Sequence, residues 1–103
     1  MSYDVYVGGE SFNYTSNMGW FFEEMGAHPK SWVGRDRKEV GREIGEALRK
    51  VARLVKSDGG WVTLKKTYDA KNGWGDVEGA TRFLIHIWSA CFDEIPDTVD
   101  VWY

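Results

Sequence analysis

The amino-acid sequence predicts an α+β fold. A small antiparallel sheet, made of an N-terminal β-hairpin and a C-terminal strand, would pack against two long amphipathic helices and a short first helix. Three observations predict it: alternating residues flank a glycine pair near the start, apolar residues recur with the helical period in two long stretches, and alternation returns at the end of the chain. Two amphipathic helices cannot bury their apolar stripes alone, so we expect both to lie on one face of the sheet.

Length and composition restrict the class of protein. The chain has 103 residues and a formal charge of −3, which suits one domain with a single core over residues 1–103. The acidic balance argues against generic nucleic-acid binding, which depends on Lys and Arg at the phosphates. Cys91 is the only cysteine, so no intrachain disulfide and no cysteine-based zinc site can form. Because the chain also lacks a signal-peptide pattern and a membrane-spanning apolar run, we expect a cytoplasmic protein. We expect no cofactor.

Residues 3–15 predict the hairpin. The stretches YDVYV and ESFNYT carry β-favouring residues, and the glycine pair between them tolerates a positive φ. We expect one face of the hairpin to carry these side chains: Tyr3, Val5, Val7, Phe12 and Tyr14.

A short helix is predicted over residues 18–25. Three N-cap residues precede it, and Gly26 suits the left-handed position that ends a helix. On a helical wheel Trp20 projects away from the apolar side, so we expect its ring to be exposed. Residues 28–35 are interpreted as a loop.

Residues 38–56 form the clearest predicted helix, because apolar residues recur at spacings of three, four and seven along one face while the other face is charged. Gly41 and Gly45 flank the apolar stripe, and each weakens the helix by about 1 kcal/mol relative to Ala. We therefore expect another element to pack closely on these two glycines.

The second half of the chain holds one open assignment. Residues 61–69 favour strand by composition but lack alternation, so a strand and a single helical turn both remain possible. The helical period resumes at Asp76 and predicts a helix as far as Ile95, just before Pro96. The last residues, TVDVWY, predict a strand, for which antiparallel pairing is favoured over parallel pairing.

The stretch NGWGDVEGA at residues 72–80 is similar to a phosphate-binding fingerprint, but it has three residues instead of two between its second and third glycines. Asp76 and Glu78 also occupy the helix N-terminus, where a pyrophosphate would lie. We interpret Asp76 as an N-cap and Glu78 as a first-turn acid that the helix dipole favours. Trp74 then lies at the tip of the turn, either packed beneath it, which is favoured, or facing solvent.

No catalytic grouping is found. Cys91 lies on the apolar stripe of its helix, which indicates a core residue and not a nucleophile. His28 and His86 share no metal-binding spacing and are interpreted as surface residues. The carboxylate pairs lie where charged helix faces are expected, and the common hydrolase, kinase and zinc-protease motifs are absent from the sequence. We expect neither an enzyme nor a metal site.

Two motifs carry a resemblance to a known group: N-Y-T-S-N at residues 13–17, and N-G-W-G-D-x-E-G-A at residues 72–80, followed by A-C at residues 90–91. The chain resembles small uncharacterised proteins of actinobacterial bacteriophages and their hosts. The resemblance implies a cytoplasmic phage product of domain size, and it implies no reaction. Residues 61–69 and the aromatic stretch MGWFF depart from the pattern.

The first function hypothesis is a non-enzymatic protein-interaction module that binds a host or defence factor, or itself. Six Trp in one small acidic domain should leave some aromatic rings at the surface, where they make efficient contacts. The contact residues of this hypothesis are Trp20, Trp32 and Trp74.

The second hypothesis is a protein that binds a small, nucleotide-like ligand between two polar helix starts. Together the two hypotheses use these candidate binding residues: Asn13, Tyr14, Thr15, Asn17, Trp20, Trp32, Asn72, Trp74, Asp76 and Glu78.

Overall fold

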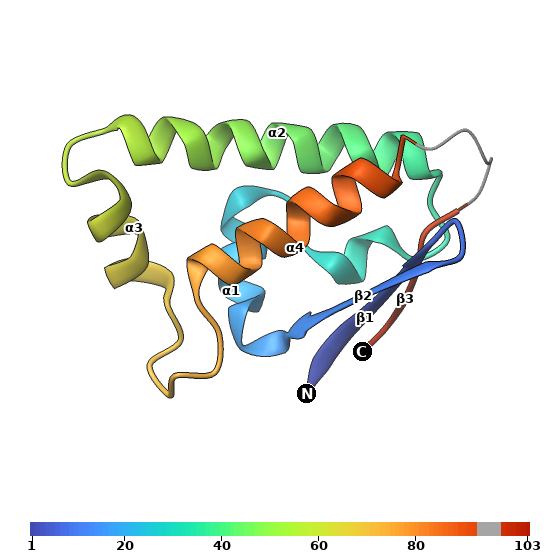
Figure 1. Cartoon of the computed structure of the whole chain (residues 1–103), viewed down its shortest axis with the longest axis horizontal. Coiled ribbons are helices and arrows are strands. Elements are labelled where there is room, and N and C mark those ends of the chain that lie inside the picture. The colour runs from blue at the N-terminus through green and yellow to red at the C-terminus, as the bar shows by residue number, and fades with distance from the viewer. Residues whose placement is uncertain (93–97) are drawn as a thin grey trace.

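The computed structural model describes residues 1–92 and 98–103 and confirms the α+β class (Figure 1). In chain order its elements are β1 (Ser2–Val7), β2 (Glu10–Thr15), the 3₁₀ turn η1 (Ser16–Met18), α1 (Gly19–Met25), the 3₁₀ turn η2 (Pro29–Trp32), α2 (Arg37–Lys56), α3 (Gly60–Tyr68), α4 (Val77–Ala90) and β3 (Asp100–Trp102).

The sheet has the strand order β2-β1-β3, and both pairings are antiparallel. Val5 of the central strand lies opposite Phe12 on β2 and opposite Val101 on β3. Gly8 and Gly9 have φ values of 55° and 84°, which the two-residue hairpin turn requires and which other residues rarely adopt. The hairpin and the antiparallel C-terminal strand are both confirmed.

The long helices form a layer over the sheet. Helix α4 packs on β2 and β1, and α2 runs beside α4 in the opposite direction (Figure 1). A Cβ at Gly41 would lie 2.9 Å from Cys91 Cβ, and one at Gly45 would lie 3.2 Å from Trp88 Nε1. The expected close packing on the α2 glycines is therefore confirmed, and α2 reaches the sheet mainly through α4.

Residues 60–68 form helix α3, which decides the open assignment in favour of a helix longer than a single turn. Its composition was ambiguous because only Leu64 is fully buried, so the helix shows little apolar periodicity. Helix α4 ends at Ala90 with Cys91 as its C-cap, so the prediction of a helix that continues through Phe92 is wrong. Ile95 lies outside the described residues.

The buried Arg37 explains part of this earlier end. Its side chain is 3% exposed, and its Nη1 donates a hydrogen bond to the carbonyl oxygen of Cys91 at 2.7 Å. A cation that bonds a terminal carbonyl also interacts favourably with the negative end of the helix dipole. Arg37 thus joins the start of α2 to the end of α4.

Trp32 is 0% exposed, so its prediction as a surface contact residue is wrong. The segment predicted as a loop contains η2, which begins at Pro29 after the N-cap His28. This 3₁₀ turn packs on β3 and directs the indole into the core, beside a cluster that includes Phe21 and Phe22. Trp32 therefore contributes to the fold and not to a surface.

Candidate functional site

Residues 13–17 and residues 72–79 meet beside the start of α4. The Tyr14 hydroxyl donates to the carbonyl oxygen of Asp76 at 3.0 Å and accepts from the N–H of Asp76, also at 3.0 Å. The Asn17 side chain donates from Nδ2 to the carbonyl oxygen of Trp74 at 3.1 Å. The two polar helix starts of the ligand hypothesis are therefore brought together.

Two glycines permit this close approach. A Cβ at Gly79 would lie 2.8 Å from Cζ of Tyr14, whose ring stacks on Phe83 with a centroid distance of 5.7 Å. Gly75 has a φ of 127°, and a Cβ there would lie 2.7 Å from Cγ2 of Thr15. A side chain at either position would push the two segments apart.

Acidic side chains cap the start of α4. The Asp76 carboxylate accepts from the N–H of Gly79 at 2.7 Å, which confirms the predicted N-cap. The Asp69 carboxylate accepts from the N–H of Val77 at 2.8 Å. These carboxylates occupy positions at which a phosphate would otherwise accept hydrogen bonds from a helix N-terminus.

The ionisation of this cluster follows from burial and from its own contacts. Burial raises the pKa of Tyr14, the bonded backbone of Asp76 lowers it, and the Asp76 charge raises it again. The phenol therefore stays protonated at neutral pH and keeps its donor role. The hydrogen bond to Asp69 is the main cause of a raised pKa for Lys65, whose Nζ also lies 3.6 Å from Glu78 Oε1.

The remaining polar candidates are also engaged locally. The Asn72 side chain accepts from the N–H of Trp74 at 2.9 Å, and the Thr15 hydroxyl accepts from the N–H of Asn17 at 3.2 Å. Asn13 alternates with Tyr14 along β2 and so projects from the opposite face of the sheet. There its Nδ2 donates to Asp4 Oδ1 at 2.6 Å. Asn13 is thus separated from the other members of the predicted site.

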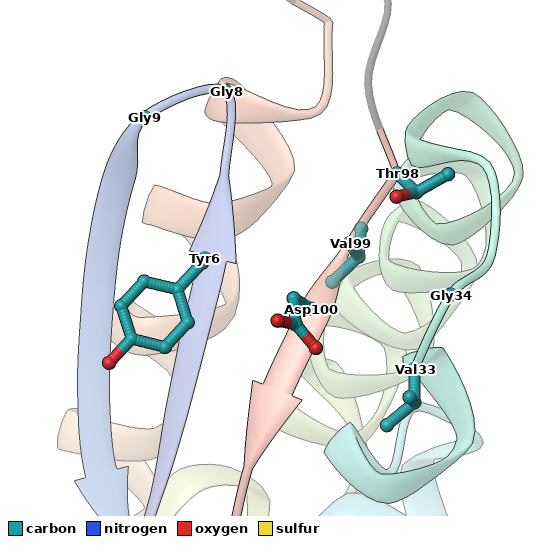
Figure 2. A pocket seen from close by; sticks show the side chains of 8 residues that line it. All are labelled: Tyr6, Gly8, Gly9, Val33, Gly34, Thr98, Val99 and Asp100. Carbon is teal, nitrogen blue, oxygen red and sulfur yellow. The ribbon is translucent and has the colours of Figure 1, made fainter.

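A hollow lies away from these residues, between the hairpin turn and β3. Figure 2 shows that the Tyr6 ring and the Asp100 carboxylate come from neighbouring strands at one side of it. Its volume is about 340 Å³, and its lining contains none of the ten candidate residues. It is lined by Tyr6, Gly8, Gly9, Val33, Gly34, Thr98, Val99 and Asp100.

The rings of Trp20 and Trp74 lie at the surface. Trp74 is 72% exposed, so the favoured alternative of a ring packed beneath the turn is wrong and the solvent-facing alternative is right. Trp20 is 57% exposed, as expected, and its ring centroid lies 4.9 Å from that of the half-buried Tyr68. We call Trp20, Tyr68 and Trp74 the Trp20–Trp74 surface. Asn17, three residues before Trp20, donates its side-chain hydrogen bond to the backbone of Trp74.

His28 is half-buried, so its interpretation as an ordinary surface residue is wrong. Its Nδ1 accepts from the N–H of Lys30 at 3.2 Å, and its Nε2 lies 3.3 Å from the Tyr3 hydroxyl. Because Nδ1 accepts, the proton of the neutral ring lies on Nε2. Burial is the main cause of a lowered pKa for His28. The ring therefore acts as a neutral cap of η2.

Cys91 is buried, and burial raises the pKa of its thiol to about 11, which confirms the prediction of a core residue. Among residues 1–92 and 98–103, no three His, Cys, Asp or Glu side chains form a group that could hold a metal ion.

Sequence reasoning missed the supporting residues of the site. Tyr68 holds the Trp20 ring, and Asp69 bonds the first N–H of α4, but both fall in the stretch whose secondary structure was left open. The contact of Tyr14 with the start of α4 was also not predicted. Its signal in the sequence was Gly79, because a glycine in the first turn of a helix is typical of a close approach by another side chain.

Neither a membrane-spanning helix among residues 1–92 and 98–103 nor a known relative is found. Within the described part of the chain, no helix combines the length and the apolar character needed to cross a bilayer. The chain matches no protein-family model, and no curated protein or solved structure is significantly similar to it.

Proposed function

We propose that this protein is a non-enzymatic protein-interaction module whose contact surface contains Trp20 and Trp74. The observation that carries the proposal is the 72% exposure of Trp74 at the tip of an ordered turn. Trp is the residue most enriched among interface positions that dominate binding energy, and a large ring kept in water makes little contribution to the core.

The backbone beneath Trp74 supports this proposal. The N–H of Ala70 donates to the carbonyl oxygen of Gly75 at 3.1 Å, and the N–H of Gly73 donates to the carbonyl oxygen of Ala70 at 3.1 Å. Asn17 and Asn72 bond the backbone of Trp74 itself. A ring on a fixed turn loses less conformational entropy when a partner binds, so the same contact area gives a higher affinity.

The polar contacts favour an interaction module over the nucleotide-like ligand. Tyr14, Asn17 and Asp76 bond one another's segments, and a ligand between them would have to break these hydrogen bonds. In line with the bacteriophage resemblance of the two motifs, the proposed partner is a host or defence protein in the cytoplasm, or a second copy of the chain.

The test compares wild-type protein with Trp20→Ala, Trp74→Ala and the control Val62→Ala, which removes a side chain that is 71% exposed on α3. Sedimentation velocity measures self-association, and affinity capture from the cells that contain the protein measures partner binding. We expect both Trp variants to stay folded and to lose an association that Val62→Ala retains. Two results together would refute the proposal: the wild-type protein is a monomer, and it captures no partner whose binding is lost in the Trp variants.

A further inference from the structure

A second apolar surface lies on the outer side of α4. Ile85, Trp88 and Phe92 are 43%, 41% and 49% exposed. Ile85 and Trp88 are three residues apart, the spacing of neighbours on one side of a helix, and Phe92 follows just beyond the C-cap of α4. The Trp88 and Phe92 rings meet edge to face, with centroids 5.5 Å apart. These side chains therefore form one strip and are not scattered surface residues.

Helix α2 continues this strip on its own surface. A Cβ at Gly41 would lie 2.9 Å from Cζ of Phe92, and Gly45 lies against Trp88. Leu48 is half-buried, Ala52 is exposed, and both follow Gly45 on the same side of α2. We call the surface formed by both helices the α2–α4 apolar face; its residues are Gly45, Leu48, Ala52, Ile85, Trp88 and Phe92.

A row of cations borders this face, although the whole chain carries a charge of −3. Seven of its thirteen Lys and Arg residues lie on α2. Exposed basic residues lie beside this face on α2, at spacings of three and four residues from Gly45 or Ala52. They are Arg42, Arg49 and Lys56, and the exposed Lys38 lies one turn before Arg42. Across the face, Arg82 lies three residues before Ile85.

Few carboxylates neutralise this row within the described residues. Glu46 pairs with Arg49 at 2.5 Å, whereas Glu39 and Glu43 pair with Arg35. In the part of the chain that the structure describes, Lys38, Arg42 and Lys56 make no ion pair with a carboxylate. The border of the apolar face is thus positively charged and open to an acidic partner.

We propose that the α2–α4 apolar face docks an amphipathic helix of a partner protein whose apolar stripe is bordered by Asp or Glu. Two adjacent helices that expose apolar residues at spacings of three and four accept a third helix as a bundle does. The stripe of the partner helix would cover Trp88, and its acids would face Arg42 and Lys56, which fixes its register.

The α2–α4 apolar face is separate from the Trp20–Trp74 surface. Figure 1 shows α2 along the upper edge of the molecule, whereas the loop between α3 and α4 lies at the lower left. Either surface can therefore fail without the other.

The test uses the full chain labelled with ¹⁵N and a pair of synthetic amphipathic helical peptides with the same Leu stripe, one bordered by Glu and the other by Lys. We expect the Glu peptide to shift the amide signals of Gly45, Ala52 and Ile85, and the Lys peptide to leave them unchanged. Raising the salt from about 0.05 to about 0.5 M should weaken binding several-fold, because the border charges are exposed to solvent.

Variants locate the binding on this face. Ile85→Lys places a charge within the exposed strip and should weaken binding at least about tenfold, and Arg42→Glu should weaken it less. Trp74→Ala and the charge control Lys66→Glu, an exposed residue of α3, should bind as the wild-type protein does.

Several results would overturn the proposal. They are equal binding of both peptides, no shifts with about 1 mM Glu peptide, and shifts centred on the Trp20–Trp74 surface. Occupation of the face by a second copy, measured as a dimer that Ile85→Lys abolishes, or by anionic lipid vesicles in preference to the peptide, would equally overturn it.

Discussion

Trp32 and Trp74 both lie in glycine-containing connections between helices, yet Trp32 is 0% exposed and Trp74 is 72% exposed. Trp32 ends a 3₁₀ turn that begins at Pro29 and packs on β3, so its ring enters the core. Trp74 lies between two glycines with positive φ on a turn closed by backbone hydrogen bonds, and its ring projects into the solvent. The comparison teaches that the conformation of the connection, and not the residue type, separates a core Trp from a displayed Trp.

The largest expected effect is on the buried ring. Trp32→Ala should lower the free energy of unfolding by about 3–5 kcal/mol, because it removes a fully buried aromatic ring and leaves a cavity. Chemical denaturation followed by circular dichroism measures the loss. A loss below about 1 kcal/mol would show that Trp32 is not a core residue and would break the comparison.

Gly79→Ala tests the close approach of Tyr14 to the start of α4, which follows the turn that carries Trp74. Ala favours a helix by about 1 kcal/mol over Gly, but its Cβ would collide with the Tyr14 ring, so we expect a net loss of about 1–3 kcal/mol in the free energy of unfolding. The same change in a Tyr14→Ala background should cost less, because the clash is absent. Stabilisation by Gly79→Ala alone would contradict the close approach.

The pH dependence of stability tests His28, the N-cap of the 3₁₀ turn that carries the buried Trp32. The pKa of His28 is lowered in the folded state, so between that pKa and the unfolded value of about 6.5 the unfolded chain binds more protons. The free energy of unfolding should therefore fall as the pH falls from about 7.5 to about 5.5. His28→Gln should reduce this pH dependence. Equal pH dependence in wild-type protein and His28→Gln would show that His28 is no neutral cap.

The smallest expected effect on stability belongs to the displayed ring. Trp74→Ala should change the free energy of unfolding by less than about 0.5 kcal/mol, because the ring is 72% exposed and its backbone bonds remain. Denaturation beside Trp32→Ala gives the comparison directly. A loss above about 2 kcal/mol would make Trp74 a staple of the fold.

Local pattern predicted the elements whose signal is contained within them. Residues 3–15 carry both strands and the turn glycines, and α2 carries a complete apolar stripe, so both were predicted from the sequence. Helix α3 was left open because it buries fully only Leu64 and shows no clear period. The end of α4 was misplaced, and the contact found there, from Arg37 to the carbonyl oxygen of Cys91, joins residues 54 positions apart in the chain.

The candidate site was predicted only in part, for the same reason. The N-cap role of Asp76 lies within three residues, and it was predicted correctly. The bonds between Tyr14 and Asp76 join residues 62 positions apart, and they decide whether the polar atoms face a ligand or each other. The turn that carries Trp74 also has a long-range contact, the hydrogen bond from Asn17 to the Trp74 carbonyl oxygen, which no local pattern contains.

The most direct test of the central claim places a photoreactive benzoylphenylalanine at position 74 and, in a second protein, at position 62, where Val62 is exposed to nearly the same extent. Both proteins are irradiated in the cells that contain them and are analysed for cross-linked products. We predict a discrete adduct with a partner protein, or with a second copy of the chain, at position 74 and not at position 62. No adduct at position 74, or the same adducts at both positions, would contradict it.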